Sequence, residues 1–102
     1  MQLAILMVAG CPHGAVLERR LAIALAGRQE ISVTRQIVTD EHQAARAGMH
    51  GSPTLLIDGS DPFAAPGGPP GLSCRIYREP GGQAEGAPSI AALSRALDGG
   101  VQ

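Results

Sequence analysis

Aromatic residues and lysine are almost or entirely missing from this sequence. Its 102 residues include one Tyr, one Phe and no Trp, and all eight basic residues are Arg. These eight are balanced by nine acidic residues, so the formal net charge is −1. A chain without a cationic field and with almost no rings for base stacking lacks what nucleic-acid binding requires. We therefore expect no nucleic-acid partner.

Long hydrophobic runs are missing as well. The longest apolar run, residues 3–10, is far shorter than the roughly 20 residues of a membrane span. No basic residue precedes this run and no cleavage region follows it, which argues against a secretory signal. We expect a cytoplasmic protein with no membrane partner. Its length predicts one domain over residues 1–102.

Cysteine is scarce, since only Cys11 and Cys74 are present. Two cysteines are too few for a disulfide scaffold. In a reducing compartment, each is more often catalytic, redox-active or simply buried than structurally cross-linked.

Hydrophobic periodicity predicts seven elements. The apolar run 3–8 is typical of a strand buried on both faces, and a leucine at every fourth position from Leu17 to Leu25 marks one face of a helix. Asp40, followed three residues later by Gln43, is typical of a helix capping box. The predicted order is strand 3–8, helix 15–26, strand 31–37, helix 40–47, strand 54–57, strand 72–78 and a last helix capped by Ser89 and ended by Gly99 and Gly100.

This βαβαββα order predicts an α/β fold with a four-stranded mixed sheet flanked by helices. The first two strands are joined through a helix, so we expect them to be parallel. The strands 54–57 and 72–78 have no helix between them and are expected to pair antiparallel. The segment 58–71 between them is rich in Gly and Pro, which predicts a long irregular loop.

Three local features resemble the thioredoxin superfamily. The segment Gly10-Cys11-Pro12-His13-Gly14 lies between the first strand and the first helix, where that superfamily carries its Cys-x-x-Cys site. Gly51-Ser52-Pro53-Thr54 resembles its cis-proline loop, and residues 40–59 follow its sequence of capped helix, loop and apolar strand. The resemblance is close over residues 3–58 and implies a thioredoxin-like fold.

The chain departs from that superfamily at Gly14, which stands where a second cysteine is expected. The motif therefore offers one thiol and no dithiol. The sequence also resembles small thioredoxin-like proteins of actinobacterial type that are loosely grouped with organomercurial (alkylmercury) lyases. That resemblance is carried by residues 51–59, by Asp61-Pro62-Phe63 and by Ser73-Cys74-Arg75.

The residues around Cys11 suit nucleophilic thiol chemistry. Cys11 directly precedes a predicted helix, whose free N–H groups and dipole favour the thiolate. Pro12 suits the first helical turn, and His13 either adds positive charge and moves a proton or is a solvated loop histidine. The resemblance implies that Pro12, Ser52 and Pro53 bind an extended substrate backbone beside Cys11.

Cys74 is the second thiol of the chain, and two roles are open for it: a buried core residue or a partner in a disulfide. On a regular strand it shares a face with Ile76 and Arg78, so we expect it to face the core. An antiparallel strand 72–78 begins at the end of the sheet opposite Cys11. We therefore expect no intramolecular disulfide with Cys11, because such a bond requires Cα atoms within about 7 Å. An intermolecular bond and a homodimer stay open.

The remaining polar residues predict no metal site and no cofactor. Cys11, His13, His50 and Cys74 lack the paired close spacings of a structural zinc site. His42 is expected on an exposed helix turn, and His50 precedes the cis-proline loop. Phe63 either pins the long loop to the sheet or forms a wall of a substrate groove.

Three functions remain open at this point. The leading hypothesis is a monothiol protein in which Cys11 forms mixed disulfides with a protein or low-molecular-weight thiol or disulfide, and an external thiol resolves them. A second is organomercurial cleavage or soft-metal binding by Cys11 and Cys74, with an acid such as Asp61 protonating carbon. A third is a non-catalytic module for partner binding or dimerisation, in which Cys11 is incidental.

Overall fold

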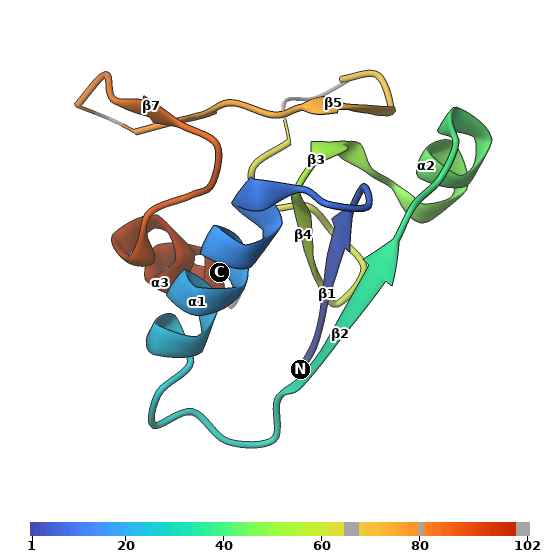
Figure 1. Ribbon diagram of the computed structural model, residues 1–102. Coiled ribbons are helices and arrows are strands. Elements are labelled where there is room, and N and C mark those ends of the chain that lie inside the picture. Colours follow the sequence, from blue (N-terminus) through green and yellow to red (C-terminus); the bar gives the residue numbers. More distant parts are fainter. Residues whose placement is uncertain (65–67, 80, 100–102) are drawn as a thin grey trace.

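The computed structural model describes residues 1–64, 68–79 and 81–99 as a small α/β domain with three helices (Figure 1). Residues 65–67 of the long loop, residue 80 and residues 100–102, which include Gly100, lie outside the described residues. The elements are β1 (Gln2–Met7), α1 (Pro12–Ala24), β2 (Ser32–Ile37), α2 (Glu41–Ala47), β3 (His50–Ser52), β4 (Thr54–Ile57), β5 (Gly71–Cys74), β6 (Tyr77–Arg78), β7 (Ala84–Glu85) and α3 (Ile90–Gly99).

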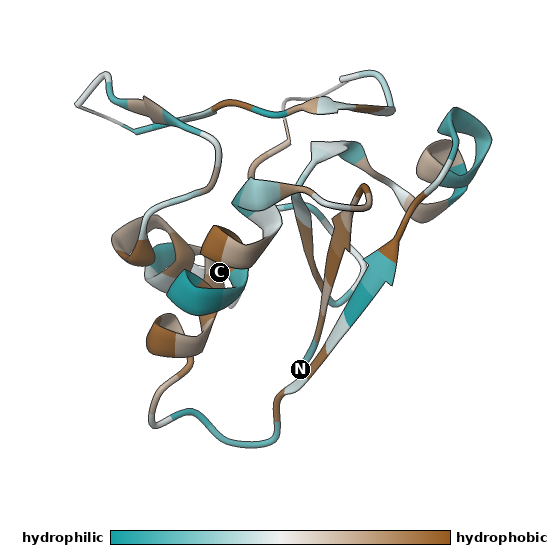
Figure 2. Cartoon of the chain, viewed as in Figure 1, coloured by the Kyte–Doolittle hydropathy of each residue, from teal (hydrophilic) through white to brown (hydrophobic). Residues whose placement is uncertain are grey.

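A mixed sheet with the order β2-β1-β4 forms the centre of the domain. β1 pairs in parallel with β2, with Leu3 opposite Val33, and antiparallel with β4, with Leu3 opposite Ile57. The parallel pairing across α1 confirms the prediction from the βαβ order. Apart from Gln2 at its start, β1 is hydrophobic (Figure 2), as expected for the central strand of a sheet that is covered on both faces.

Hydrophobic side chains pack on both faces of this sheet, because successive side chains of β1 point to opposite faces. Leu3, Ile5 and Met7 pack on the side covered by α1 and α3, and Leu6 packs on the other side, where α2 lies. α3 contributes Leu93 and Leu97 to the first cluster, as the spacing of its leucines predicts.

α2 and α3 begin where the sequence predicts, whereas α1 begins at Pro12, three residues before its predicted start. The side chain of Asp40 accepts a hydrogen bond from the N–H of Gln43 at 2.7 Å, which confirms the cap of α2. Gln43 in turn accepts from the N–H of Thr39 at 2.8 Å, so the reciprocal bond closes one residue earlier than in a standard capping box. Within the described residues, no helix has the length and apolar character needed to cross a membrane.

The prediction for residues 72–78 is wrong in its pairing. β5 runs parallel to β3, while β6 forms a separate antiparallel ribbon with β7. The described residues therefore contain a three-stranded central sheet where four strands were expected. The connection after β4 is too long for a tight hairpin turn, and β5 lies along β3 instead of β4 (Figure 1).

Candidate functional site

Cys11 lies between the end of β1 and the start of α1, as predicted. It is the N-cap residue of α1, its side chain makes no capping hydrogen bond, and Pro12 opens the first turn. The backbone N–H of Cys11 donates to the carbonyl oxygen of Val8 at 3.2 Å, which closes the turn between strand and helix. Its thiol is partly buried against the α1 and α3 side of the core. Cys11 therefore combines partial access with a position at a helix N-terminus.

The loop at residues 51–54 is tied to the segment that precedes Cys11. The Ser52–Pro53 peptide bond is cis, as the resemblance implies. The Ser52 hydroxyl oxygen accepts a hydrogen bond from the N–H of Val8 at 3.1 Å. Ser52, Pro53 and Thr54 are all buried. The loop and the Cys11 turn consequently form one unit at the same end of the sheet.

His13 is partly buried in the first turn of α1. Its ring lies directly against the backbone of Gly86, where a Cβ atom would clash with the ring. This packing explains why residue 86 is glycine and distinguishes His13 from a solvated loop histidine. Pro12 is exposed beside it.

Met7 occupies the space beside Gly14 where a second cysteine side chain would begin. A Cβ atom built on Gly14 would lie 2.5 Å from the Met7 Sδ atom and 2.7 Å from its Cε atom. Both distances are well inside van der Waals contact. The chain therefore fills this place with a thioether from β1, and the missing second thiol is a packed feature of the site.

We expect the Gly14→Cys variant to lose about 1–3 kcal/mol of unfolding free energy, because the new Cβ overpacks the core. Met7→Ala alone should cost about 2–5 kcal/mol through the cavity it leaves. Because Met7 is the group in the way, the double variant should cost less than the sum of the two. Denaturant unfolding under reducing conditions measures all three; strictly additive costs would contradict the packing argument.

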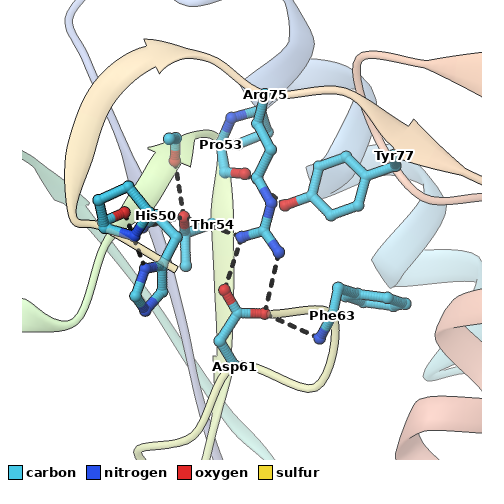
Figure 3. A network of polar contacts seen from close by, with 9 residues as sticks. His50, Pro53, Thr54, Asp61, Phe63, Arg75 and Tyr77 are labelled. Carbon is cyan, nitrogen blue, oxygen red and sulfur yellow. Dashed lines mark hydrogen bonds and ion pairs between the residues drawn. The ribbon is translucent and has the colours of Figure 1, made fainter. Parts of the chain in front are cut away.

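A buried ion pair lies next to the cis-proline loop (Figure 3). The Arg75 guanidinium contacts the Asp61 carboxylate at 2.6 Å, with side chains 10% and 3% exposed. Arg75 also donates to the Thr54 hydroxyl oxygen at 3.3 Å, and that hydroxyl donates to the carbonyl oxygen of Gly51 at 2.6 Å. The pair thus anchors the long loop and the segment after β5 to the cis-proline loop.

Sequence reasoning missed this ion pair. Asp61 lies in a Gly- and Pro-rich loop and Arg75 lies fourteen positions later, so no short-range pattern relates them. Asp61 also accepts from the N–H of Phe63 at 2.9 Å. Its carboxylate is therefore engaged by Arg75 and the loop backbone, and no observation singles it out as a proton donor to a substrate.

Tyr77 joins the ion pair to the cis-proline loop. Its hydroxyl donates to the carbonyl oxygen of Pro53, the Arg75 guanidinium lies 4.6 Å from its ring centre, and Phe63 packs edge-on at 5.5 Å. Burial raises the pKa of the Tyr77 phenol well above its usual range; Arg75 lowers this pKa, and the charges of Asp61 and Cys11 raise it further. Phe63 therefore has the packing role that was one of its two predicted roles.

The Tyr77 phenol should stay protonated in the folded protein beyond pH 10. The unfolded chain releases this proton near the ordinary pKa of about 10, so the unfolding free energy should fall as pH rises above that value. Tyr77 is the one tyrosine and there is no Trp, so phenolate absorbance reports on it alone. The Tyr77→Phe variant should lose less unfolding free energy above pH 10, because it has no phenol to ionise. Titration near pH 10 without unfolding would contradict the expectation.

Cys74 is exposed, so the prediction of a core-facing thiol is wrong. Its partner in the β3–β5 ladder is Ser52, and the N–H of Arg75 donates to the carbonyl oxygen of Ser52 at 3.1 Å. Cys74 therefore lies at the cis-proline loop and not at the opposite end of the sheet. The expectation of no Cys11–Cys74 disulfide assumed that strand 72–78 pairs antiparallel with strand 54–57. Because that pairing is wrong, the distance argument no longer applies.

The histidines outside the Cys11 motif have no shared site. His42 is exposed on α2, as expected. The Nδ1 atom of His50 lies 3.2 Å from the carbonyl oxygen of Pro69. Within residues 1–64, 68–79 and 81–99, no three His, Cys, Asp or Glu side chains are grouped as metal ligands.

A groove of about 550 Å³ adjoins the Tyr77 network. It runs between the Phe63 and Tyr77 rings and the helix α3. Among its described lining residues are three arginines, Arg75, Arg78 and Arg95, and one glutamate, Glu79. Glu79 lies 3.9 Å from Arg95. Arg75 is paired with Asp61 and Arg95 with Glu79, so most of the arginine charge at this groove is already balanced by carboxylates.

Comparison with known proteins produced no relative: no family model, curated protein or solved structure matches this chain.

Proposed function

We propose that this protein is a thioredoxin-like monothiol protein in which Cys11 forms mixed disulfides. The observation that carries the proposal is the position of Cys11, a partly accessible free thiol heading α1 in the turn tied to the Ser52–Pro53 loop. N–H groups at a helix N-terminus stabilise an anion, and the thiolate is the nucleophilic form of cysteine.

The proposed reaction is one thiol–disulfide exchange. The Cys11 thiolate attacks one sulfur of a disulfide R–S–S–R, the Cys11–S–S–R bond forms, and the bond between the two R–S groups breaks. The leaving group departs as a thiolate and takes a proton from water. The disulfide is the oxidant, so the step needs no cofactor.

The thioredoxin-like fold is part of this proposal. It is supported by the parallel β1–α1–β2 crossover, the antiparallel β4 and the loop Gly51-Ser52-Pro53-Thr54 at the sheet end next to Cys11. Because thiol exchange through a free cysteine suits a reducing compartment, a cytoplasmic location accompanies the proposal.

The substrate is proposed to be a low-molecular-weight or protein disulfide. Glutathione disulfide is a suitable probe, because it is a small soluble disulfide whose adduct on a cysteine is identified by its mass. Ser52 and Pro53 are buried, and their carbonyl oxygens already accept from the N–H of Arg75 and from the Tyr77 hydroxyl, so in this proposal they support the Cys11 turn and do not bind the substrate backbone.

No specific observation favours the two other functions over this one. Organomercurial cleavage needs an acid near the thiols, and the Asp61 carboxylate is bound to Arg75 at 2.6 Å. A non-catalytic binding module is the alternative that remains if Cys11 is inert.

Incubation of the reduced protein with glutathione disulfide tests the proposal. Samples are quenched with acid over time, and intact mass and peptide mapping locate the adduct. We expect one glutathione on Cys11, formed several-fold faster than on a cysteine peptide of the same local sequence, because only the folded chain has the helix terminus. A folded protein that reacts no faster than the peptide would overturn the proposal.

A further inference from the structure

The Cys11 motif has no resolving thiol of its own, since the third residue after Cys11 is Gly14. Gly14 lies against the Met7 thioether, so the third position after Cys11 carries no side chain. The chain has only one other cysteine, Cys74. Its location therefore decides whether the protein contains a second thiol for the site.

The β3–β5 pairing places Cys74 at the cis-proline loop. Cys74 is opposite Ser52 in a parallel ladder, and neighbouring strands lie about 4.8 Å apart. Ser52 is itself bonded through its hydroxyl to the N–H of Val8, and Val8 is bonded to Cys11. The two cysteines are thus connected to each other through one short chain of hydrogen-bonded residues.

The residues that follow Cys74 contact the cis-proline loop. Arg75 is held on the Ser52 carbonyl oxygen and lies over the ring of Tyr77. The Tyr77 hydroxyl is bonded to the Pro53 carbonyl oxygen, and the charge of Cys11 acts on that phenol. The cis-proline loop therefore contacts both the segment that contains Cys74 and the turn that contains Cys11.

β5 is a short strand whose irregular pairing and exposed residues allow it to move. It has four residues, its ladder with β3 is irregular between His50 and Ser52, and both Ser73 and Cys74 are exposed. Both thiols are free in this structure, and a disulfide requires Cα atoms within about 7 Å. Formation of the bond therefore requires the two Cα atoms to come within this distance, and the Arg75–Asp61 ion pair holds the chain that follows Cys74.

We propose that Cys74 is the resolving thiol of the Cys11 mixed disulfide, and this inference rests on the proposed function. The Cys74 thiolate attacks the Cys11 sulfur, the Cys11–Cys74 bond forms, and the bond from Cys11 to the substrate sulfur breaks. The substrate leaves as a thiolate and takes a proton from water. Over both steps one low-molecular-weight disulfide is reduced to two thiols, and the two cysteines are oxidised to one disulfide.

The Cys74→Ser variant tests this role. After addition of glutathione disulfide, the full chain should form a transient adduct that converts to a form two hydrogens lighter, with Cys11 and Cys74 linked in the peptide map. In Cys74→Ser the adduct on Cys11 should form at an unchanged rate and persist about tenfold longer or more, since a linked thiol has a high effective concentration.

The matched control is Cys74→Ser combined with Ser32→Cys, which moves the second thiol to an exposed position at the start of β2. This variant should retain the adduct as Cys74→Ser does, and resolution in the unaltered chain should not depend on protein concentration. Persistence of the adduct in the unaltered chain, or a link only between two molecules, would overturn the role of Cys74 and leave the proposed function intact. Absence of any adduct on Cys11, in the unaltered chain and in Cys74→Ser alike, would overturn both.

Discussion

Replacing Cys11 with serine should abolish mixed-disulfide formation at the candidate site. Serine keeps the size of the side chain at the N-cap of α1, but its hydroxyl is not a nucleophile toward disulfides at neutral pH. We therefore expect the rate of glutathione incorporation to fall to that of Cys74 alone. Serine is a preferred N-cap residue, so the variant should be at least as stable as the unaltered protein.

This result is informative because the two cysteines differ in their surroundings. Cys74 is the more exposed thiol, yet only Cys11 heads a helix. If exposure alone governed reactivity, Cys74→Ser would remove most incorporation and Cys11→Ser would remove little. Thiol labelling of the two variants, followed by mass spectrometry, separates these outcomes and would refute the proposed function in the second case.

Removing one partner of the Arg75–Asp61 ion pair should have the largest effect on stability. Either Arg75→Ala or Asp61→Ala leaves an unpaired charge where the side chains are 10% and 3% exposed. Such a loss typically costs about 3–5 kcal/mol, against a total stability of about 5–15 kcal/mol for a domain. Denaturant unfolding monitored by circular dichroism measures the difference.

Two controls separate burial from simple loss of charge. Arg35→Ala breaks the ion pair with Glu18, whose side chains are 60% and 38% exposed, and should cost at most about 1 kcal/mol. The double variant Arg75→Met with Asp61→Leu removes both buried charges and should be more stable than either single alanine variant. Equal losses for Arg75→Ala and Arg35→Ala would show that the buried pair contributes no more than a surface pair.

The first part of the fold was predictable because its signals are local. The apolar run of β1, the leucine spacing of α1 and the Asp40 cap of α2 each occupy fewer than a dozen residues. The parallel partner of β1 followed from the chirality of a βαβ connection, and the candidate nucleophile followed from its place between strand and helix.

The second part was predicted less well because its structure depends on long-range contacts. A period of two identified residues 72–78 as extended but said nothing of their partner. The structure divides this stretch between β5 and β6, and the break lies at Arg75, whose side chain turns toward Asp61. Cys74, expected in the core, is exposed as a consequence.

The sequence by itself determined the helix that Cys11 heads, the strand before it and the absence of a second thiol at Gly14, since each depends on residues adjacent in the chain. Only the tertiary structure decided that the Met7 side chain lies in the space beside Gly14 and that Cys74 lies opposite Ser52. The physical reason is that packing and strand pairing depend on the path of the intervening chain. A loop rich in Gly and Pro leaves that path to distant contacts such as the buried Arg75–Asp61 pair.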